Sequence, residues 1–534
     1  MVAKTNIVSR HRMISRNRIK STTICKLSKN IIKQNTSQLQ YETYETYIKS
    51  IVHNFTISKH IEPLLAKIFK TKDNIKFTIT CKEQKLNKNT RIPPFIEILK
   101  YLIMKTEFIQ NFTTDEQRQL KSIIKKDDSK PNSKLFYIFL NKSSIGKKIS
   151  NLYYSLDNSI KSKLIIKYPS ILFHSLLINS YTSFEIIADL DTNIKTLYTF
   201  SIEWNNKKID NLLYLFMYKN NKHNNNNNNN NKNNKNSNKN LEYIKNIGNE
   251  IIKRILFFNE FLNIDKLPNK FIVFLTNNKK EIDDNVLLQM HFKTLNINSA
   301  VTNGTDIIIY RQEELLKSIF HELIHFHNLD FRHVPDKLLE YLKKTHNIKS
   351  DNEYTLFECV TESLANILNN IFLSKDINIF ANNLEHELIF STFQVAKILT
   401  ICRYKDWNEF AVLDNSNSNN THNIKKQFKQ DSCVFSYYIL KFYIMLNLEI
   451  YFNNCLDTNL KFIQSEHSFD TLIKLFDISR NNLTLKDLMN NILGNKKNKI
   501  LSKKKQNHTN GKVNKTQYKV KQTLRMTCLE SNII

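Results

Sequence analysis

Residues 312–327, QEELLKSIFHELIHFH, predict one helix with two different faces, and this segment constrains the fold more than any other. At about 100° per residue, one arc of such a helix is apolar throughout. That arc consists of Leu315, Leu316, Ile319, Phe320, Leu323 and Ile324. His321 and His325 lie almost opposite it. We therefore expect the helix to pack on a core with one face and to turn the other toward a polar cleft.

The order of elements around this helix predicts an α+β fold. A helix at 241–262, a strand at 271–276 and extended segments at 295–301 and 305–310 are expected before it. The apolar spacing after it is helical, at 336–345, 353–373, 384–402 and 433–451. Strands first and helices afterwards favour a small mixed or antiparallel sheet followed by a mainly helical domain.

Low-complexity segments indicate how the chain is divided. An unbroken asparagine run fills 224–231, and 414–423 is rich in Asn and Ser, so neither segment can bury enough apolar surface to fold. We expect a basic disordered arm at 1–35 and a separate α+β region of unknown role at 36–215, with a helix at 94–112 and strands at 76–81 and 197–204. An Asn- and Lys-rich linker at 216–240 should follow. The domain with the two histidines should span 241–494 around the disordered insertion 414–423, and a basic tail should end the chain at 495–534.

Composition narrows the class of protein. The 79 Lys and Arg against 49 Asp and Glu give a formal charge of +30, which favours nucleic acid as a partner of the basic arms. The excess is mostly lysine and accompanies heavy Asn and Ile use, a bias typical of an AT-rich genome.

Seven cysteines without a C-x-x-C pair argue against a thiolate zinc cluster and for a reducing compartment. No apolar run reaches the ~18 residues of a membrane span. We expect a soluble, intracellular protein of the cytoplasm, although the first 41 residues, without Asp or Glu, would also suit a transit peptide.

Residues 321–325 read HELIH, an HExxH motif. Four residues apart on a helix, His321 and His325 project from one face about one turn apart, where two imidazoles can bind one Zn²⁺. Glu322 points to the side of that pair. It is then placed to act as general base, taking a proton from a water molecule that the metal acidifies. The alternative is a surface helix with two solvated histidines.

A catalytic zinc site usually has three protein ligands, so this one requires a third ligand downstream. The helix expected at 353–373 carries Glu358 and Glu362 one turn apart, opposite its own apolar arc. Two helices would then back onto the core and face each other across a metal. Glu358 is the preferred ligand, but the two glutamates could exchange roles.

The combination of HExxH with E-x-x-x-[D/E] on a later helix resembles the gluzincin family of zinc metallopeptidases. The resemblance implies a zincin-like domain, a Zn²⁺ cofactor, peptide or protein substrates, and the ligands His321, His325 and Glu358. It also implies that Glu322 is the catalytic base. By the same resemblance, Glu362 hydrogen-bonds a zinc-bound histidine.

Further parts of a gluzincin site can be nominated. Asn298, Ser299 and Ala300 look like the edge strand that lines a zincin cleft and pairs with a peptide, although they also suit plain sheet structure. Tyr437, Tyr438, His422 and His467 are candidates for stabilising an oxyanion, although the two tyrosines also suit a core. Two positions depart from known patterns. His327 replaces the apolar residue usual after the motif, and Phe331 stands where a metzincin has His or Asp.

Residues around FSTFQVAKIL and FKQDSCVFSYYILK, and the tail TLRMTCLE, resemble uncharacterised metallopeptidases of giant DNA viruses. This wider resemblance implies a virion as the alternative location. We predict a zinc-dependent metallopeptidase, and an endopeptidase because an open edge strand suits an internal stretch of peptide. The alternatives are a hydrolase of non-peptide bonds, and a non-enzymatic structural or nucleic-acid-associated protein with a structural or vestigial metal site.

Overall fold

The computed structural model describes residues 61–85, 113–118, 194–218, 233–411, 429–494 and 523–530. Short gaps fall at 116, 284–285, 288–289, 303, 347 and 349–354. Several expectations therefore lie outside the described residues: the basic arm 1–35, the helix at 94–112, the insertion 414–423 and most of the tail.

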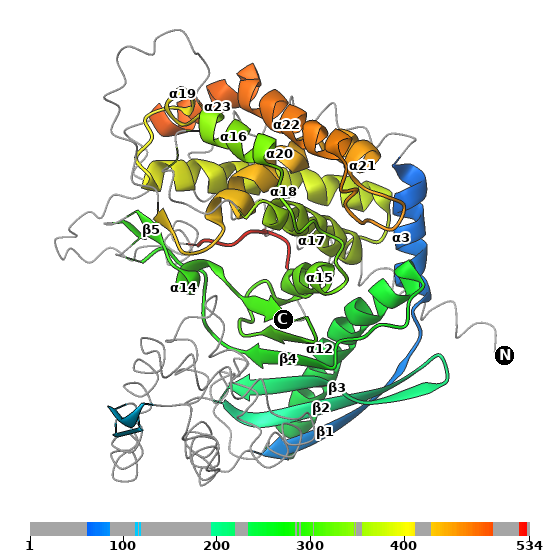
Figure 1. The fold of residues 1–534 in the computed structure, drawn as a ribbon. Coiled ribbons are helices and arrows are strands. Elements are labelled where there is room, and N and C mark those ends of the chain that lie inside the picture. Colours follow the sequence, from blue (N-terminus) through cyan, green and yellow to red (C-terminus); the bar gives the residue numbers. More distant parts are fainter. Residues whose placement is uncertain are drawn as a thin grey trace.

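A six-stranded mixed sheet forms one layer of the molecule (Figure 1). Its spatial order is β1 (Thr78–Lys85), β2 (Ile194–Trp204), β3 (Lys207–Tyr218), β4 (Lys270–Leu275), β7 (Asp306–Ile309) and β6 (Ala300–Thr302). The pairs β1–β2, β2–β3 and β6–β7 are antiparallel, whereas β3–β4 and β4–β7 are parallel. The central strand β4, KFIVFL, is buried along nearly its whole length, as a strand covered on both faces must be. A separate short pair joins β5 (His291–Phe292) to β8 (Lys429–Gln430).

The first three strands correct the expectation of a separate N-terminal region at 36–215. They belong to the same sheet as the strands before the HExxH helix, because β3 pairs in parallel with β4. Parallel neighbours need a crossover, and α12 (Asn233–Leu262) provides it, beginning inside the segment expected to be a linker. On α12, Gly248 lies so near the Phe200 ring of β2 that a Cβ atom would overlap it. Local patterning could not reveal a pairing between strands more than fifty residues apart.

Helices form the second layer, above the sheet in Figure 1, and they confirm the α+β class. The longer ones are α15 (Leu315–Phe326), α16 (Asp336–Thr345), α17 (Phe357–Leu373), α18 (Ile377–Ile401), α21 (Leu448–Cys455), α22 (Glu466–Asn481) and α23 (Leu483–Gly494). Short α14 (Thr294–Ile297) and α19 (Trp407–Phe410) lie in connections. Helix α3 (Glu62–Asn74) joins this layer, since Lys72 Nζ donates to the carbonyls of Ile371 and Ser374 at the end of α17.

Two helices differ from their expected form. Helix α18 begins at Ile377 rather than 384, because the Asp376 side chain caps it by accepting a hydrogen bond from the Ile379 N–H. The helix expected at 433–451 is divided into a π-helical segment η4 (Phe435–Leu440), α20 (Lys441–Leu446) and α21. π-Helical turns inside helices frequently occur at functional sites. In the described residues, no helix has both the length and the apolar character needed to cross a bilayer.

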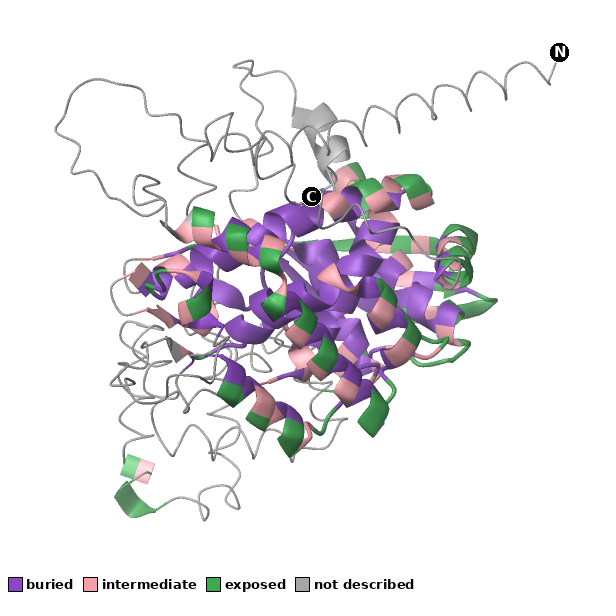
Figure 2. Ribbon diagram, turned by 90° about the horizontal axis from the view of Figure 1, so that it is seen from above, coloured by how far each residue is buried: buried purple, intermediate pink, exposed green. Residues whose placement is uncertain are grey.

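The buried residues lie between the sheet and the helices and inside the helical layer (Figure 2). The apolar arc of α15 is buried as its spacing predicts, and Phe320 meets the rings of Phe257 and Phe258 on α12. Full burial of such a side chain contributes roughly 1.5–3 kcal/mol. The arc therefore fixes how α15 rotates, which decides where its histidines point.

Part of the expected basic tail 495–534, residues 523–530, packs into the fold. Residues 523–530 run through the helical layer, with the side chains of Leu524, Met526, Thr527 and Leu529 buried. Leu524 N–H donates to the Lys280 carbonyl, and Glu281 forms a β-bridge with Thr523. Three apolar side chains within six residues give this segment a reason to enter the core.

Candidate metal centre

Helix α15 presents both histidines of the HExxH motif on its polar side. The Nε2 atoms of His321 and His325 lie 3.2 Å apart. Their placement follows from the helical repeat, because residues four apart share a face. The opposite apolar arc is held by α12 and the sheet, so the pair is fixed to a rigid support.

Helix α17 packs along α15 and supplies the carboxylates. Glu358 Oε2 lies 3.1 Å from His321 Nε2 and 3.4 Å from His325 Nε2. Glu362, one turn later, reaches the far side of the His321 ring, where its Oε2 lies 3.0 Å from Nδ1. The structure therefore brings both glutamates to the histidines and gives Glu358 the position of the third ligand.

The three donor atoms have the spacing that a zinc ion requires. Donors at about 2.1 Å from a tetrahedral zinc lie about 3.4 Å from one another. Those of His321, His325 and Glu358 are separated by 3.1 to 3.4 Å. Glu358 Oε2 is also buried and makes no hydrogen bond of good geometry, although both rings are near. A buried oxygen without a hydrogen bond suits a cation at the point that the three atoms share.

Both histidines are oriented from behind by a carboxylate. Glu362 holds His321 through Nδ1, and Asp330 Oδ2 lies 2.7 Å from Nδ1 of His325. A metal-binding histidine typically donates its other ring N–H to such a group, which fixes the tautomer and the ring plane. Glu362 in turn forms an ion pair with Lys317, whose Nζ lies 2.6 Å from Glu362 Oε1.

The charges of the cluster favour a cation. Burial disfavours a proton on His325, but Glu358 and Asp330 outweigh it and raise the pKa of this ring well above its usual value. Burial also opposes ionisation of Glu358, yet His325 and His321 lower its pKa to about 2. Both pKa shifts have the same cause, which is the attraction between the ionised Glu358 carboxylate and positive charge on the two rings. A metal ion would replace the protons on Nε2, since it binds neutral imidazole and ionised carboxylate.

A cavity of about 390 Å³ opens beside the cluster. The cluster, Glu322, Tyr437 and residues 297–302 are among its walls. Glu322 is almost fully buried, and burial raises the pKa of its carboxyl group, toward the range in which a general base works at neutral pH. Within the described sheet, β6 has a neighbour on one side only. The cavity therefore combines a candidate base with the edge strand β6 at Ala300 and, in the loop before it, with Asn298 and Ser299.

The structure separates the two tyrosines. Tyr437 lines the cavity, and its ring centroid lies 5.8 Å from that of His321. Burial raises the pKa of its hydroxyl well above the usual value, so it stays a hydrogen-bond donor. Tyr438 points elsewhere and donates to the Leu524 carbonyl in the C-terminal segment. The structure thus assigns Tyr438 a packing role and corrects its nomination for the site.

The remaining histidines lie away from the cluster or outside the described residues. His327 caps the end of α15 and packs against Phe258, with ring centroids 5.3 Å apart. Burial lowers the pKa of this imidazole to about 4. His467 is exposed and contacts Asn454, whereas His422 is among the residues not described. His327 therefore fills the apolar position that the motif usually has, as a neutral packing residue.

Sequence reasoning missed two residues that support the cluster. Asp330 stands five residues after the second histidine, a distance that the turn ending α15 shortens to hydrogen-bond contact. Lys317 lies one turn before His321 on the same face of α15, and this four-residue spacing was a signal that could have identified it. Met526, which also lines the cavity, could not be found from the motif, since 200 residues separate it from the helix.

The chain was compared with known proteins at three levels. No protein-family model matches its sequence, no curated protein matches it, and no solved structure matches its fold. What indicates a metal centre is the geometry of the chain's own residues.

Proposed function

We propose that this protein is a zinc-dependent hydrolase and that its substrates are peptides. The observation that carries the proposal is the convergence of three donor atoms, 3.1 to 3.4 Å apart, beside a buried glutamate in a cavity. His321, His325 and Glu358 would hold the ion. A zinc ion held there would polarise a substrate carbonyl and make a nearby water more acidic.

The chain's own residues supply the other parts of the reaction. Glu322 takes the proton of the attacking water and passes it to the leaving amine. Tyr437, which lines the cavity, would donate a hydrogen bond to the carbonyl oxygen as negative charge develops on it. Asp330 and Glu362 keep the two rings in the ligating tautomer.

Among the described strands, β6 has a neighbour on one edge only, and its other edge favours a peptide over other substrates. An extended peptide can add to a free strand edge through main-chain hydrogen bonds, whatever its side chains. Residues 297–302 bring that edge to the cavity wall beside the cluster. Because such pairing needs no free terminus, an endopeptidase is the preferred form of this activity.

Metal analysis of the full-length protein tests the proposal. We expect one zinc per chain, loss of zinc in His321→Ala, and full retention in the matched control His327→Ala, whose ring faces Phe258 instead. A library of fluorescence-quenched peptides should be hydrolysed, and a chelator should stop the reaction until zinc is restored. A chain that takes up no zinc would exclude the metal centre, whereas a zinc-loaded chain that cleaves only non-peptide bonds would exclude the substrate class.

A further inference from the structure

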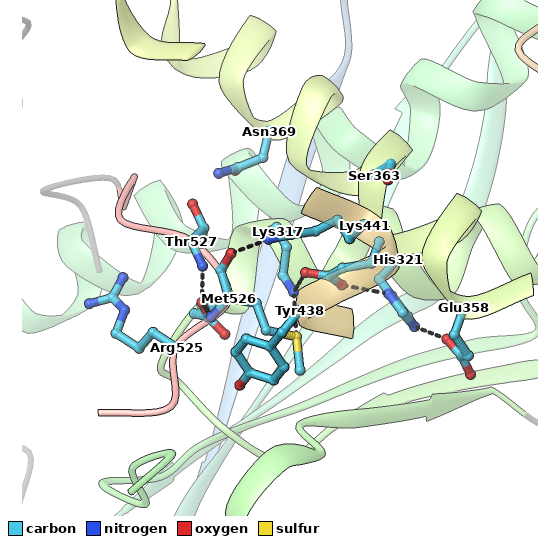
Figure 3. Close-up of polar contacts among 12 residues, drawn as sticks. Lys317, His321, Glu358, Ser363, Asn369, Tyr438, Lys441, Arg525, Met526 and Thr527 are labelled. Carbon is cyan, nitrogen blue, oxygen red and sulfur yellow. Dashed lines mark hydrogen bonds and ion pairs between the residues drawn. The ribbon is translucent and has the colours of Figure 1, made fainter. Parts of the chain in front are cut away.

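The C-terminal segment Thr523–Glu530 is largely buried, and Figure 3 shows it on the side of Lys317 that is away from His321 and Glu358. Its backbone is bound mainly by side chains of the domain. The carbonyl oxygens of residues 523, 524, 525 and 526 accept hydrogen bonds from the side chains of Lys397, Tyr438, Gln394 and Lys441, respectively. A chain held by its main-chain groups occupies a defined position even though it contains no helix or long strand.

Two buried glutamates bind the N–H groups of the segment. Glu314 Oε1 accepts from Met526 N–H at 2.6 Å and Thr527 N–H at 2.7 Å. Glu387 Oε1 accepts from the N–H groups of 528 and 529 at 2.9 and 3.0 Å. The segment therefore supplies two backbone donors to one oxygen of each carboxylate, and without them these oxygens would need another partner in the interior.

Lys317 is a buried cation that contacts both the segment and a glutamate of the metal centre. Its ammonium lies 2.6 Å from Glu362 Oε1 and 3.6 Å from the sulfur of Met526. Glu362 uses its second oxygen on His321. Lys317 is 3% exposed and Glu362 is fully buried, so this pair has little access to water. The contacts thus run from Met526 through Lys317 and Glu362 to the His321 ring.

We propose that Lys317 is a positioning residue of the metal centre and that the C-terminal segment keeps it paired with Glu362. Without the segment, Glu314 and Glu387 lose four backbone donors and become rival partners for the Lys317 ammonium. Glu362 then loses its ion pair with Lys317, and the ring of His321 loses its fixed orientation. This inference rests on the proposed zinc site, and it adds a requirement for residues 523–530.

Substitution of Lys317 tests the first half of the proposal. Lys317→Met should lower the zinc affinity of the full chain about 10- to 100-fold, the usual cost of losing an outer partner of a metal ligand. Lys317→Arg, which keeps the charge, should restore most of that affinity. Lys72→Met is the matched control, because this buried lysine donates to the carbonyls of Ile371 and Ser374 at the other end of α17. The visible spectrum of bound Co²⁺ should change in Lys317→Met alone, which a general loss of stability would not produce.

Displacement of the segment tests the second half. Leu529 is 2% exposed, so Leu529→Asp should expel the segment, which trypsin would report by cutting after Arg525. Zinc affinity should then fall as in Lys317→Met, and the double variant should show no further loss, because both changes act on one pathway. Leu529→Met is the control that keeps the segment in place.

The outcomes separate this inference from the function on which it rests. A wild-type chain that binds no zinc overturns both. If the Lys317→Met variant binds zinc as tightly as the wild-type chain, only the positioning role is overturned. Undiminished zinc affinity in a Leu529→Asp protein that trypsin cuts after Arg525 overturns the role of the segment. If Leu529→Asp fails to fold, the comparison of Lys317→Met with Lys317→Arg still decides whether Lys317 positions the site.

Discussion

Glu314, Glu387, Gln394, Lys397 and Lys441 bind the C-terminal segment and form what we call its channel. This channel and the metal cluster are built from the same kinds of side chain but use them differently. In the channel, Glu314 has a partner for each oxygen, since Oε1 accepts two backbone N–H groups and Oε2 pairs with Lys280 at 2.6 Å. In the cluster, Glu358 Oε2 faces two rings beside an open cavity and makes no good hydrogen bond. Buried carboxylates that the chain itself satisfies hold structure together. A buried carboxylate oxygen that makes no hydrogen bond, next to a cavity that can hold a substrate, is a candidate ligand for a catalytic cation.

The substitution with the largest expected effect is Glu322→Gln, on the metal-cluster side of this comparison, and the effect is on catalytic turnover. Glu322→Gln keeps the size of the side chain but removes its ability to take a proton, so turnover of a peptide substrate should fall about 10²- to 10⁴-fold. Zinc content should stay at one per chain, because Glu322 is outside the set of ligands. Steady-state kinetics with metal analysis of the same sample measures both, and undiminished turnover would contradict the assigned role of Glu322.

A large loss of stability is expected on the channel side of the comparison. Glu314→Gln leaves Lys280 buried without its counter-ion, which should lower the free energy of unfolding by ~3 kcal/mol at pH 7. Urea unfolding measures this, with the exposed Glu340→Gln as control, for which a change within about 0.5 kcal/mol is expected.

The same variant has a defined pH dependence. Burial opposes ionisation of Glu314, but Lys280 and Lys317 lower its pKa to about 2, below the usual 4.5. Its contribution to stability is therefore complete above about pH 4.5 and is lost as the pH falls toward 2. The difference between wild type and Glu314→Gln should shrink over that range. A difference that grew on acidification would show that Glu314 does not stabilise the channel as a carboxylate.

The smallest expected effect lies at the edge of the cluster. Asp330→Asn weakens the acceptor for His325 Nδ1 without touching the donor atoms, so zinc affinity should fall about 10- to 100-fold. Competition with a chromogenic chelator measures this, beside the surface variant Asp336→Asn, which should match wild type. Should the two variants bind zinc equally well, Asp330 would have no part in the site.

Much of the site could be predicted from local spacing, because helices convert spacing into geometry. The intervals between His321 and His325 and between Glu358 and Glu362 put each pair on one face, and α16 spans the expected 336–345. Asp330 was missed because it acts across a turn, where sequence distance does not translate into a direction. Tyr437 and Tyr438 could not be distinguished, because the π-helical segment η4 changes which neighbour faces the cleft.

The sequence by itself determined the α+β class, the two-faced helix and the residues able to bind a metal, since each depends on contacts within one or two turns. Only the tertiary structure decided that the strands of the N-terminal region join the sheet and that residues 523–530 enter the core. It also decided which glutamate faces the two Nε2 atoms. Those outcomes depend on pairing and packing between residues far apart in the chain, 213 positions in the case of Glu314 and Thr527, and a local pattern contains no record of which distant partner will satisfy a buried group.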